Sequence, residues 1–197
     1  MAHGRNPKHR ASRGWQATRS PTKFAVMVRE NDMPSVFGKL NLKDQNEVLI
    51  LNAPESFEPE LATLRNVAIV RDLKKTKVAT FSLAFVTTQQ EVDTVVPAIA
   101  RKAQGDAIVW FAYPKGTSKK YKSQINRDNG WKVFGAEGFE PVRMVAIDED
   151  WSAIRFRRIE FLNKMTRARE HRLTEQAKRG EPSPSAKPRP SKGTTAH

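Results

Sequence analysis

The segment from Lys115 to Lys122 holds the side chains in this sequence that are best suited to binding chemistry. Four lysines stand among a glycine, two hydroxyl residues and a tyrosine, in the order Lys115, Gly116, Thr117, Ser118, Lys119, Lys120, Tyr121 and Lys122. Ammonium groups and hydroxyls hold phosphate oxygens by charge and by hydrogen bonds. The glycine spacing and the Gly-Lys-Ser/Thr order of a P-loop are absent. The pattern therefore predicts phosphate or nucleic-acid contact by a basic loop, with a merely solvated loop as the alternative.

Two further ligand candidates, Asn52 and Asp72, stand at the ends of segments that are predicted to be strands. In an open α/β sheet, ligands bind outside the carboxyl ends of the strands, near the point where the strand order reverses. Asn52 begins an Asn-Ala-Pro-Glu-Ser-Phe segment, whereas a close approach to a nucleotide cofactor needs glycines after the first strand. We therefore expect no cofactor, and keep S-adenosylmethionine as the alternative.

Histidine and cysteine are absent from the middle of the chain. The histidines are His3, His9, His171 and His197, and the sequence contains no cysteine. This removes the commonest general base, the commonest metal ligands and the most nucleophilic side chain from the predicted domain. We name no catalytic residue and expect binding rather than catalysis. Methyl transfer stays open, because it sometimes needs no general base.

The acids at 148–150 are assigned to a turn and not to a metal site. Three adjacent carboxylates rarely converge on one ion, so no metal is expected. We predict that Asp148 or Ser152 caps this turn and that Trp151 packs beneath it.

Short unbroken apolar runs predict the strands that must position these residues. The runs lie at 47–52, 66–72, 80–87 and 106–113, and such runs are typical of strands buried on both faces. Two later segments, 141–147 and 153–161, predict an antiparallel hairpin. A change of alternation at Arg157-Arg158 predicts a β-bulge there.

Helices are expected between the strands, at 57–64, 88–103 and 126–137. The second is the clearest, because Thr88 and Glu91 have the spacing of a capping box. The fold class that follows is α/β: a three-layer Rossmann-like sandwich with a mostly parallel sheet of four strands and a C-terminal antiparallel hairpin. This topology resembles a trimmed S-adenosylmethionine-dependent methyltransferase fold.

Three stretches carry a family resemblance. They lie at 39–43 with 48–57, at 83–87 with 110–118, and at 145–156, and the residues at 119–123 and 125–128 agree with the same family. Together they resemble a small bacterial family, a domain of unknown function, in its Bacteroidetes-type version. The resemblance covers about residues 37–166 and implies a fold rather than a reaction.

The two ends of the chain are basic. Residues 1–33 carry seven Lys/Arg against two acids, and residues 162–197 carry nine against three, within a net charge of +14. We expect a disordered arm over 1–33, one α/β domain over 34–162, a basic helix over 163–179 and a disordered Pro/Ser/Lys-rich tail over 180–197. Such ends favour polyanions. The nucleic-acid candidates are Arg5, Arg10, Arg13, Trp15, Arg19, Tyr121, Arg167, Arg169 and Arg172.

These features leave three functions open. The first, which we favour, is a non-catalytic module that contacts nucleic acid, the ribosome or another polyanion. The second is a divergent methyltransferase or nucleotide-binding protein, and the third is a subunit that pairs through the edge of the final hairpin near 155–161. The first residues lack the apolar stretch of a signal peptide, and no run is long enough to cross a bilayer, so a cytoplasmic protein without membrane insertion is expected.

Overall fold

The computed structural model describes residues 35–162 and 172–179. Six strands form one sheet in the order β2-β1-β3-β4-β6-β5. Strands β1 to β4 run parallel to one another, and β6 runs antiparallel to both β4 and β5. The strands are β1 (Glu47–Leu51), β2 (Ala68–Val70), β3 (Ala79–Phe85), β4 (Ala103–Pro114), β5 (Phe139–Ala146) and β6 (Trp151–Arg158).

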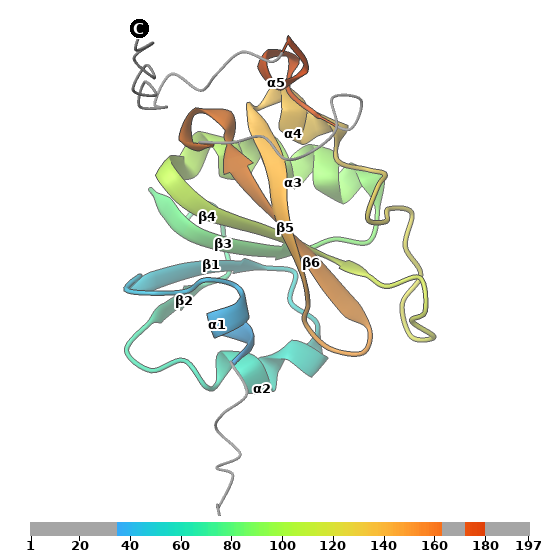
Figure 1. The fold of residues 1–197 in the computed structure, drawn as a ribbon. Coiled ribbons are helices and arrows are strands. Elements are labelled where there is room, and N and C mark those ends of the chain that lie inside the picture. Colours follow the sequence, from blue (N-terminus) through green and yellow to red (C-terminus); the bar gives the residue numbers. More distant parts are fainter. Residues whose placement is uncertain (1–34, 163–171, 180–197) are drawn as a thin grey trace, which may run out of the picture. The chain divides into compact units, whose positions relative to one another are not determined.

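Helices cover both faces of this sheet (Figure 1). One face, here called the α3 face, packs against α3 (Gln89–Lys102) and α4 (Lys132–Ala136). The other, the α1 face, packs against α1 (Val36–Lys39), the 3-10 turn η1 (Glu55–Phe57) and α2 (Glu58–Leu61). The predicted fold class, a three-layer Rossmann-like sandwich with four parallel strands and an antiparallel hairpin, is thereby confirmed.

Aromatic side chains fill the core on the α3 face. The rings of Phe134 and Phe156 stack with centroids 3.5 Å apart, and Phe111 meets Phe134 edge to face at 4.9 Å. Trp131 is 5% exposed and packs beside Tyr113. Edge-to-face and offset aromatic pairs contribute about 0.5–1.5 kcal/mol each beyond the area they bury.

The α1 face has a separate aromatic cluster. Phe57 packs against Phe85 at 4.9 Å, and Phe85 meets Trp151 at 5.1 Å. At its centre the fully buried Trp110 donates its indole N–H to the Leu40 carbonyl at 2.7 Å. This bond ties the segment before β1 to the middle of the sheet.

Helix α3 has the predicted capping box. The Thr88 hydroxyl accepts from the Glu91 N–H, and the Glu91 carboxylate accepts from the Thr88 N–H. Val92, Val96 and Ile99 then face the sheet as their spacing requires. The helix ends at Lys102, close to the predicted end.

The predicted helix over 126–137 is mostly wrong. Only Lys132–Ala136 is helical. The Asn126 carboxamide accepts from the N–H groups of Asp128 and Asn129, which holds a turn, and Gly130 has φ +105°, outside the helical region. A local side-chain bond therefore outcompetes the helical pattern here.

The predicted bulge lies on the neighbouring strand. The register of β5 against β6 shifts between Pro141 and Arg143, so the extra residue belongs to β5 and not to Arg157-Arg158. Strand β6 ends at Arg158, and the change of alternation after it comes from the 3-10 turn η2 (Ile159–Phe161).

The exposed edge of the hairpin also differs from the prediction. Strand β6 lies between β4 and β5, so the outer strand is β5, and the predicted pairing edge near 155–161 is already occupied on both sides. The helix expected at 57–64 is shorter, ending at Leu61. Of the helix expected at 163–179, α5 (Glu175–Arg179) is described, and residues 163–171 lie outside the described residues.

No helix in the described ranges is long and apolar enough to cross a membrane.

Candidate functional site

The basic segment after β4 forms a loop at the carboxyl edge of the sheet, as predicted from its position. The Lys115 N–H donates to the Asp150 carbonyl at 2.7 Å, and its ammonium group donates to the Asp148 carbonyl at 2.6 Å. Ser118 fixes the next turn, because its hydroxyl donates to Asp150 at 2.7 Å and accepts from the Tyr121 N–H at 3.1 Å. The loop is therefore anchored to the turn that joins β5 and β6.

That turn has the predicted construction. The Asp148 carboxylate accepts from the N–H groups of Asp150 and Trp151 at 2.8 and 2.7 Å. Trp151 is buried and packs against Phe85 and Tyr121. Asp148 thus caps the turn, whereas Ser152 is part of β6 and pairs with Tyr113 and Ala146.

A pocket of about 500 Å³ opens beside this loop. Four of the predicted phosphate residues line it, namely Lys115, Gly116, Ser118 and Lys122, together with neighbouring residues of the same segment up to Asn126. Thr117, Lys119 and Lys120 belong to the same loop but do not line the pocket, and all three are exposed. The ring of Tyr121 packs on Trp151 with the ring centroids 4.9 Å apart. The Lys120 ammonium group lies over the Tyr121 ring, 5.3 Å from its centroid.

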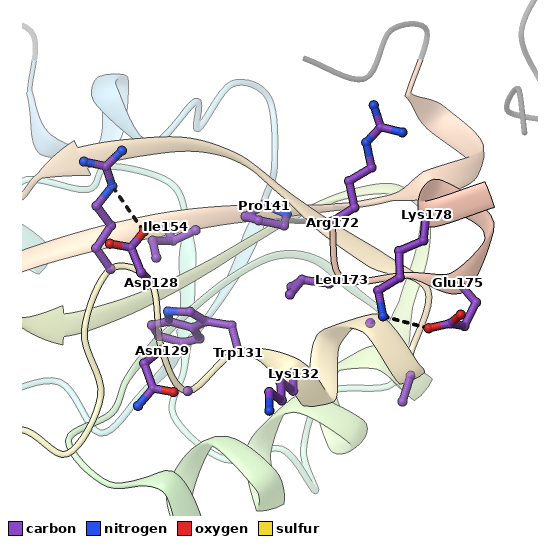
Figure 2. A pocket seen from close by; sticks show the side chains of 14 residues that line it. Asp128, Asn129, Trp131, Lys132, Pro141, Ile154, Arg172, Leu173, Glu175 and Lys178 are labelled. Atoms are coloured by element: carbon purple, nitrogen blue, oxygen red, sulfur yellow. Dashed lines mark hydrogen bonds and ion pairs between the residues drawn. The ribbon is translucent and has the colours of Figure 1, made fainter. Parts of the chain in front are cut away.

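A second pocket, of about 590 Å³, continues along the chain and was not predicted. Figure 2 shows Asp128, Asn129, Trp131 and Lys132 on one side of it, and Arg172, Leu173, Glu175 and Lys178 from the C-terminal segment on the other. Lys178 pairs with Glu175 at 2.7 Å, and Arg172 donates to the Ala177 carbonyl at 2.8 Å. The Asn129-Gly130 pair, a strong turn signal, could have indicated a loop here rather than a helix.

The C-terminal segment is held in place by a buried carboxylate. Glu140, 4% exposed, accepts from the N–H groups of Leu173 and Thr174 and from the Thr174 hydroxyl, at 2.8, 2.6 and 2.9 Å. Three such bonds offset the cost of burying this carboxylate oxygen. Arg172 is therefore positioned at the second pocket, whereas Arg5, Arg10, Arg13, Trp15, Arg19, Arg167 and Arg169 lie outside the described residues.

Both pockets lie along one strongly basic segment. Residues 115–132 carry six Lys/Arg and a single acid, Asp128, and within 34–161 the other residues carry 13 Lys/Arg against 15 Asp/Glu. The positive excess of the folded domain is thus concentrated in this segment. Within the described ranges, no ion pair or hydrogen bond engages the side chains of Lys119, Lys122 and Lys132.

The other predicted edge residues are used within the chain. Asn52, with φ 54°, donates to the Phe85 carbonyl at 3.4 Å and so joins the ends of β1 and β3. Asp72 accepts from the Lys74 N–H at 2.8 Å in its own turn. Neither residue lines either of the two pockets described above.

The loop after β1 lacks the glycines that let a backbone approach a nucleotide cofactor closely. Pro54 lacks an N–H, and Phe57, only 1% exposed, fills the space beside Phe85 where the loop after β1 turns back. No group of three or more potential metal ligands lies together within the described residues.

Comparison with known proteins gives distant structural matches. No family model matches the chain, and no curated protein matches it. Among solved structures, one assigned to the type 11 methyltransferases of Sulfolobus solfataricus has 10% identity and a TM-score of 0.39, covering 66% of this chain and 90% of that one. The N-methyltransferase NodS from Bradyrhizobium japonicum WM9 has 12% identity and a TM-score of 0.35, covering 58% and 85%.

Similarity at this level carries no information about what this chain binds. The fold class rests on the strand order and strand directions given above. The family resemblance of the three sequence stretches stays a prediction.

Proposed function

We propose that this protein is a non-catalytic module that binds nucleic acid through residues 115–132. The observation that carries the proposal is the concentration of cations there: six Lys/Arg against one Asp, on a domain that is otherwise slightly acidic. Phosphate backbones attract such a surface and release counterions when they bind it.

Several features of the segment support this function. The loop is anchored through Ser118 to Asp150, so its lysines are presented from a fixed backbone. Lys119 and Lys122 are exposed and free to contact phosphates. The polar groups of Ser123, Gln124 and Asn126 near the smaller pocket suit hydrogen bonds to sugar and base edges.

The basic ends of the chain extend the same electrostatic argument. Residues 1–33 and 162–197 together hold most of the net charge of +14. A basic arm beside a folded domain strengthens binding in a salt-dependent way and adds little sequence preference.

A salt titration of the full chain tests the proposal. We expect binding of single-stranded RNA or duplex DNA whose affinity falls steeply between 50 and 200 mM salt. The double variant Lys119→Gln/Lys122→Gln should lower the slope of log affinity against log salt by roughly 0.9 per lost phosphate contact on duplex DNA. Lys43→Gln/Lys74→Gln removes the same charge from exposed positions outside the segment, and should give a smaller loss.

Equal losses of affinity in the two double variants would mean that only the net charge matters. That result would contradict a binding site in residues 115–132. An affinity that does not change with salt concentration would contradict nucleic-acid binding altogether. Calorimetry with S-adenosylmethionine addresses the methyltransferase alternative, for which saturable heat would be the supporting result.

A further inference from the structure

Three arginines gather on the α1 face of the sheet, where β5 and β6 pair. Arg143 on β5 lies directly opposite Arg155 on β6, and Arg157 follows two residues later, so it points to the same face. Like charges directly opposite each other on neighbouring strands destabilise a sheet. The sequence therefore keeps an unfavourable pair at this place.

The surrounding groups neutralise only part of this charge. Arg157 makes a two-pronged ion pair with Asp106, with its Nε 2.6 Å from Oδ1. Arg143 donates to a neutral oxygen, that of Asn41, at 3.2 Å. Among the described residues, Asp106 is the one carboxylate that makes an ion pair with this cluster. Glu140 lies opposite Arg157 in the strand register, but its carboxylate accepts from Leu173 and Thr174.

Arg155 lies between these two and lacks a partner for its buried donor. Its Nε is buried and has no hydrogen-bond acceptor among the described residues. Burial lowers the pKa of its guanidinium, and the positive charges of Arg157 and Arg143 lower it further, while Asp106 acts in the opposite direction. A buried N–H without an acceptor costs about as much as a lost hydrogen bond.

A bound oxyanion would remove both defects together. Its oxygen would accept from Nε, and its charge would offset the excess of two guanidinium groups. An apolar ligand would leave Nε without an acceptor. A neutral carbonyl would accept from Nε but would not offset the repulsion between the guanidinium groups. Arg143 is exposed and the other two are partly exposed, so a small anion reaches the cluster from solvent, and the Arg155 side chain must turn to bring its buried Nε to that anion.

We propose that Arg143, Arg155 and Arg157 form a binding site for a phosphoryl oxyanion. The site is distinct from the basic loop. Arg157 pairs with Asp106 near the start of β4, whereas Lys115 follows the end of that strand. The proposal therefore does not rest on nucleic-acid binding by residues 115–132.

Proton–nitrogen NMR of arginine side chains tests the site directly in the full chain. Inorganic phosphate and pyrophosphate are titrated at constant ionic strength, with chloride and acetate as reference anions. We expect the Arg155 Nε–H resonance to shift saturably with the phosphates and the melting temperature to rise. The same shift with acetate would mean a general carboxylate or anion site, and shifts confined to other arginines would overturn the proposal.

Variants separate the site from general charge effects. Arg155→Met should keep or raise the melting temperature in chloride, because a repulsive charge is lost, and should abolish the rise with pyrophosphate. Arg65→Met removes an exposed arginine elsewhere and should keep that rise. A pyrophosphate response retained in Arg155→Met would overturn the proposal.

Two further variants keep the test independent of folding and of the proposed function. If Arg155→Met does not fold, the exposed Arg143→Gln should weaken pyrophosphate binding about tenfold, and unchanged binding would overturn the proposal. Lys119→Gln/Lys122→Gln should retain the full pyrophosphate response, since it alters only the loop. Loss of the response in that variant would assign the phosphate to the loop instead.

Discussion

Single polar side chains hold the segments that carry the candidate site. Glu91 is the clearest case, because its carboxylate accepts from the Thr87 N–H, the Thr88 N–H and the Thr87 hydroxyl at 2.7, 3.0 and 3.1 Å. These bonds fix the start of α3 and also the end of β3. Burial raises the pKa of Glu91, and the bonds from Thr87 and Thr88 more than offset it, so the pKa lies below the usual 4.5.

Glu91→Gln should therefore destabilise the protein in a pH-dependent way. Because the folded-state pKa is lowered, the contribution of the carboxylate is fully present above pH 4.5 and is lost as the pH falls through the lowered pKa. We expect a loss of about 1 kcal/mol at pH 7, shrinking towards zero in strong acid, in urea unfolding measured at both pH values. A loss that does not change with pH would mean that the carboxylate charge has no part in the cap.

The docking of the C-terminal segment is the main element-scale feature that positions the larger pocket. Besides the bonds to Glu140, the segment packs closely on α4: a Cβ at Gly135 would overlap the backbone carbonyl of Leu173. Glycine is thus required at this contact by close approach rather than by its backbone angles. The second pocket exists only where this segment is docked.

Gly135→Ala is expected to release the segment while leaving the sheet folded. Trypsin should then cut faster at Arg172, Lys178 and Arg179, and the Thr174 amide should exchange with solvent faster. Gly116→Ala is the control, because a Cβ at Gly116 meets no atom within 4 Å. Equal cleavage of the two variants would show that the contact with Leu173 does not hold the segment.

Local sequence patterns predict most of the strands and the start of α3, whereas the strand register and the larger pocket depend on long-range contacts. Strands β1, β3 and β4 and the capping box of Thr88 and Glu91 could be read from apolar runs and spacing. The loop at Lys115 was placed correctly because it follows a buried strand. The bulge was put on β6 instead of β5, because alternation along one strand does not report its register with another.

The larger pocket depends on a long-range contact that local sequence patterns do not predict. Glu140 reaches Leu173 and Thr174 across more than 30 residues, and nothing in the spacing of an acid and a threonine predicts that pairing. The arginine cluster was missed for the same reason, since Arg143 and Arg155 become neighbours only through the register of β5 and β6.

At the scale of the whole domain, one sheet separates two hydrophobic cores. Trp131 belongs to the core on the α3 face, and Trp110 and Trp151 belong to that on the α1 face. Strands β3 and β4 contribute side chains to both cores, as Phe81 and Ala84 do from β3. Unfolding of one core therefore disrupts the strands against which the other core packs.

We expect a single cooperative unfolding transition for this domain. Labelling with 5-fluorotryptophan gives each buried indole its own resonance without a substitution, and a urea titration then reports both cores at once. The signals of Trp110, Trp131 and Trp151 should share one midpoint. An earlier midpoint for Trp131 would mean that the α3 side unfolds separately.

One of the two edge strands of the sheet, β5, affects how the protein behaves at high concentration. Strand β5 lies at the end of the sheet, and an open strand edge can template the pairing of further chains into fibrils. Pro141 has no N–H to offer, the register shift beside it bends the ladder, and Arg143 adds a charge. These features make the β5 edge a poor template for pairing with another chain.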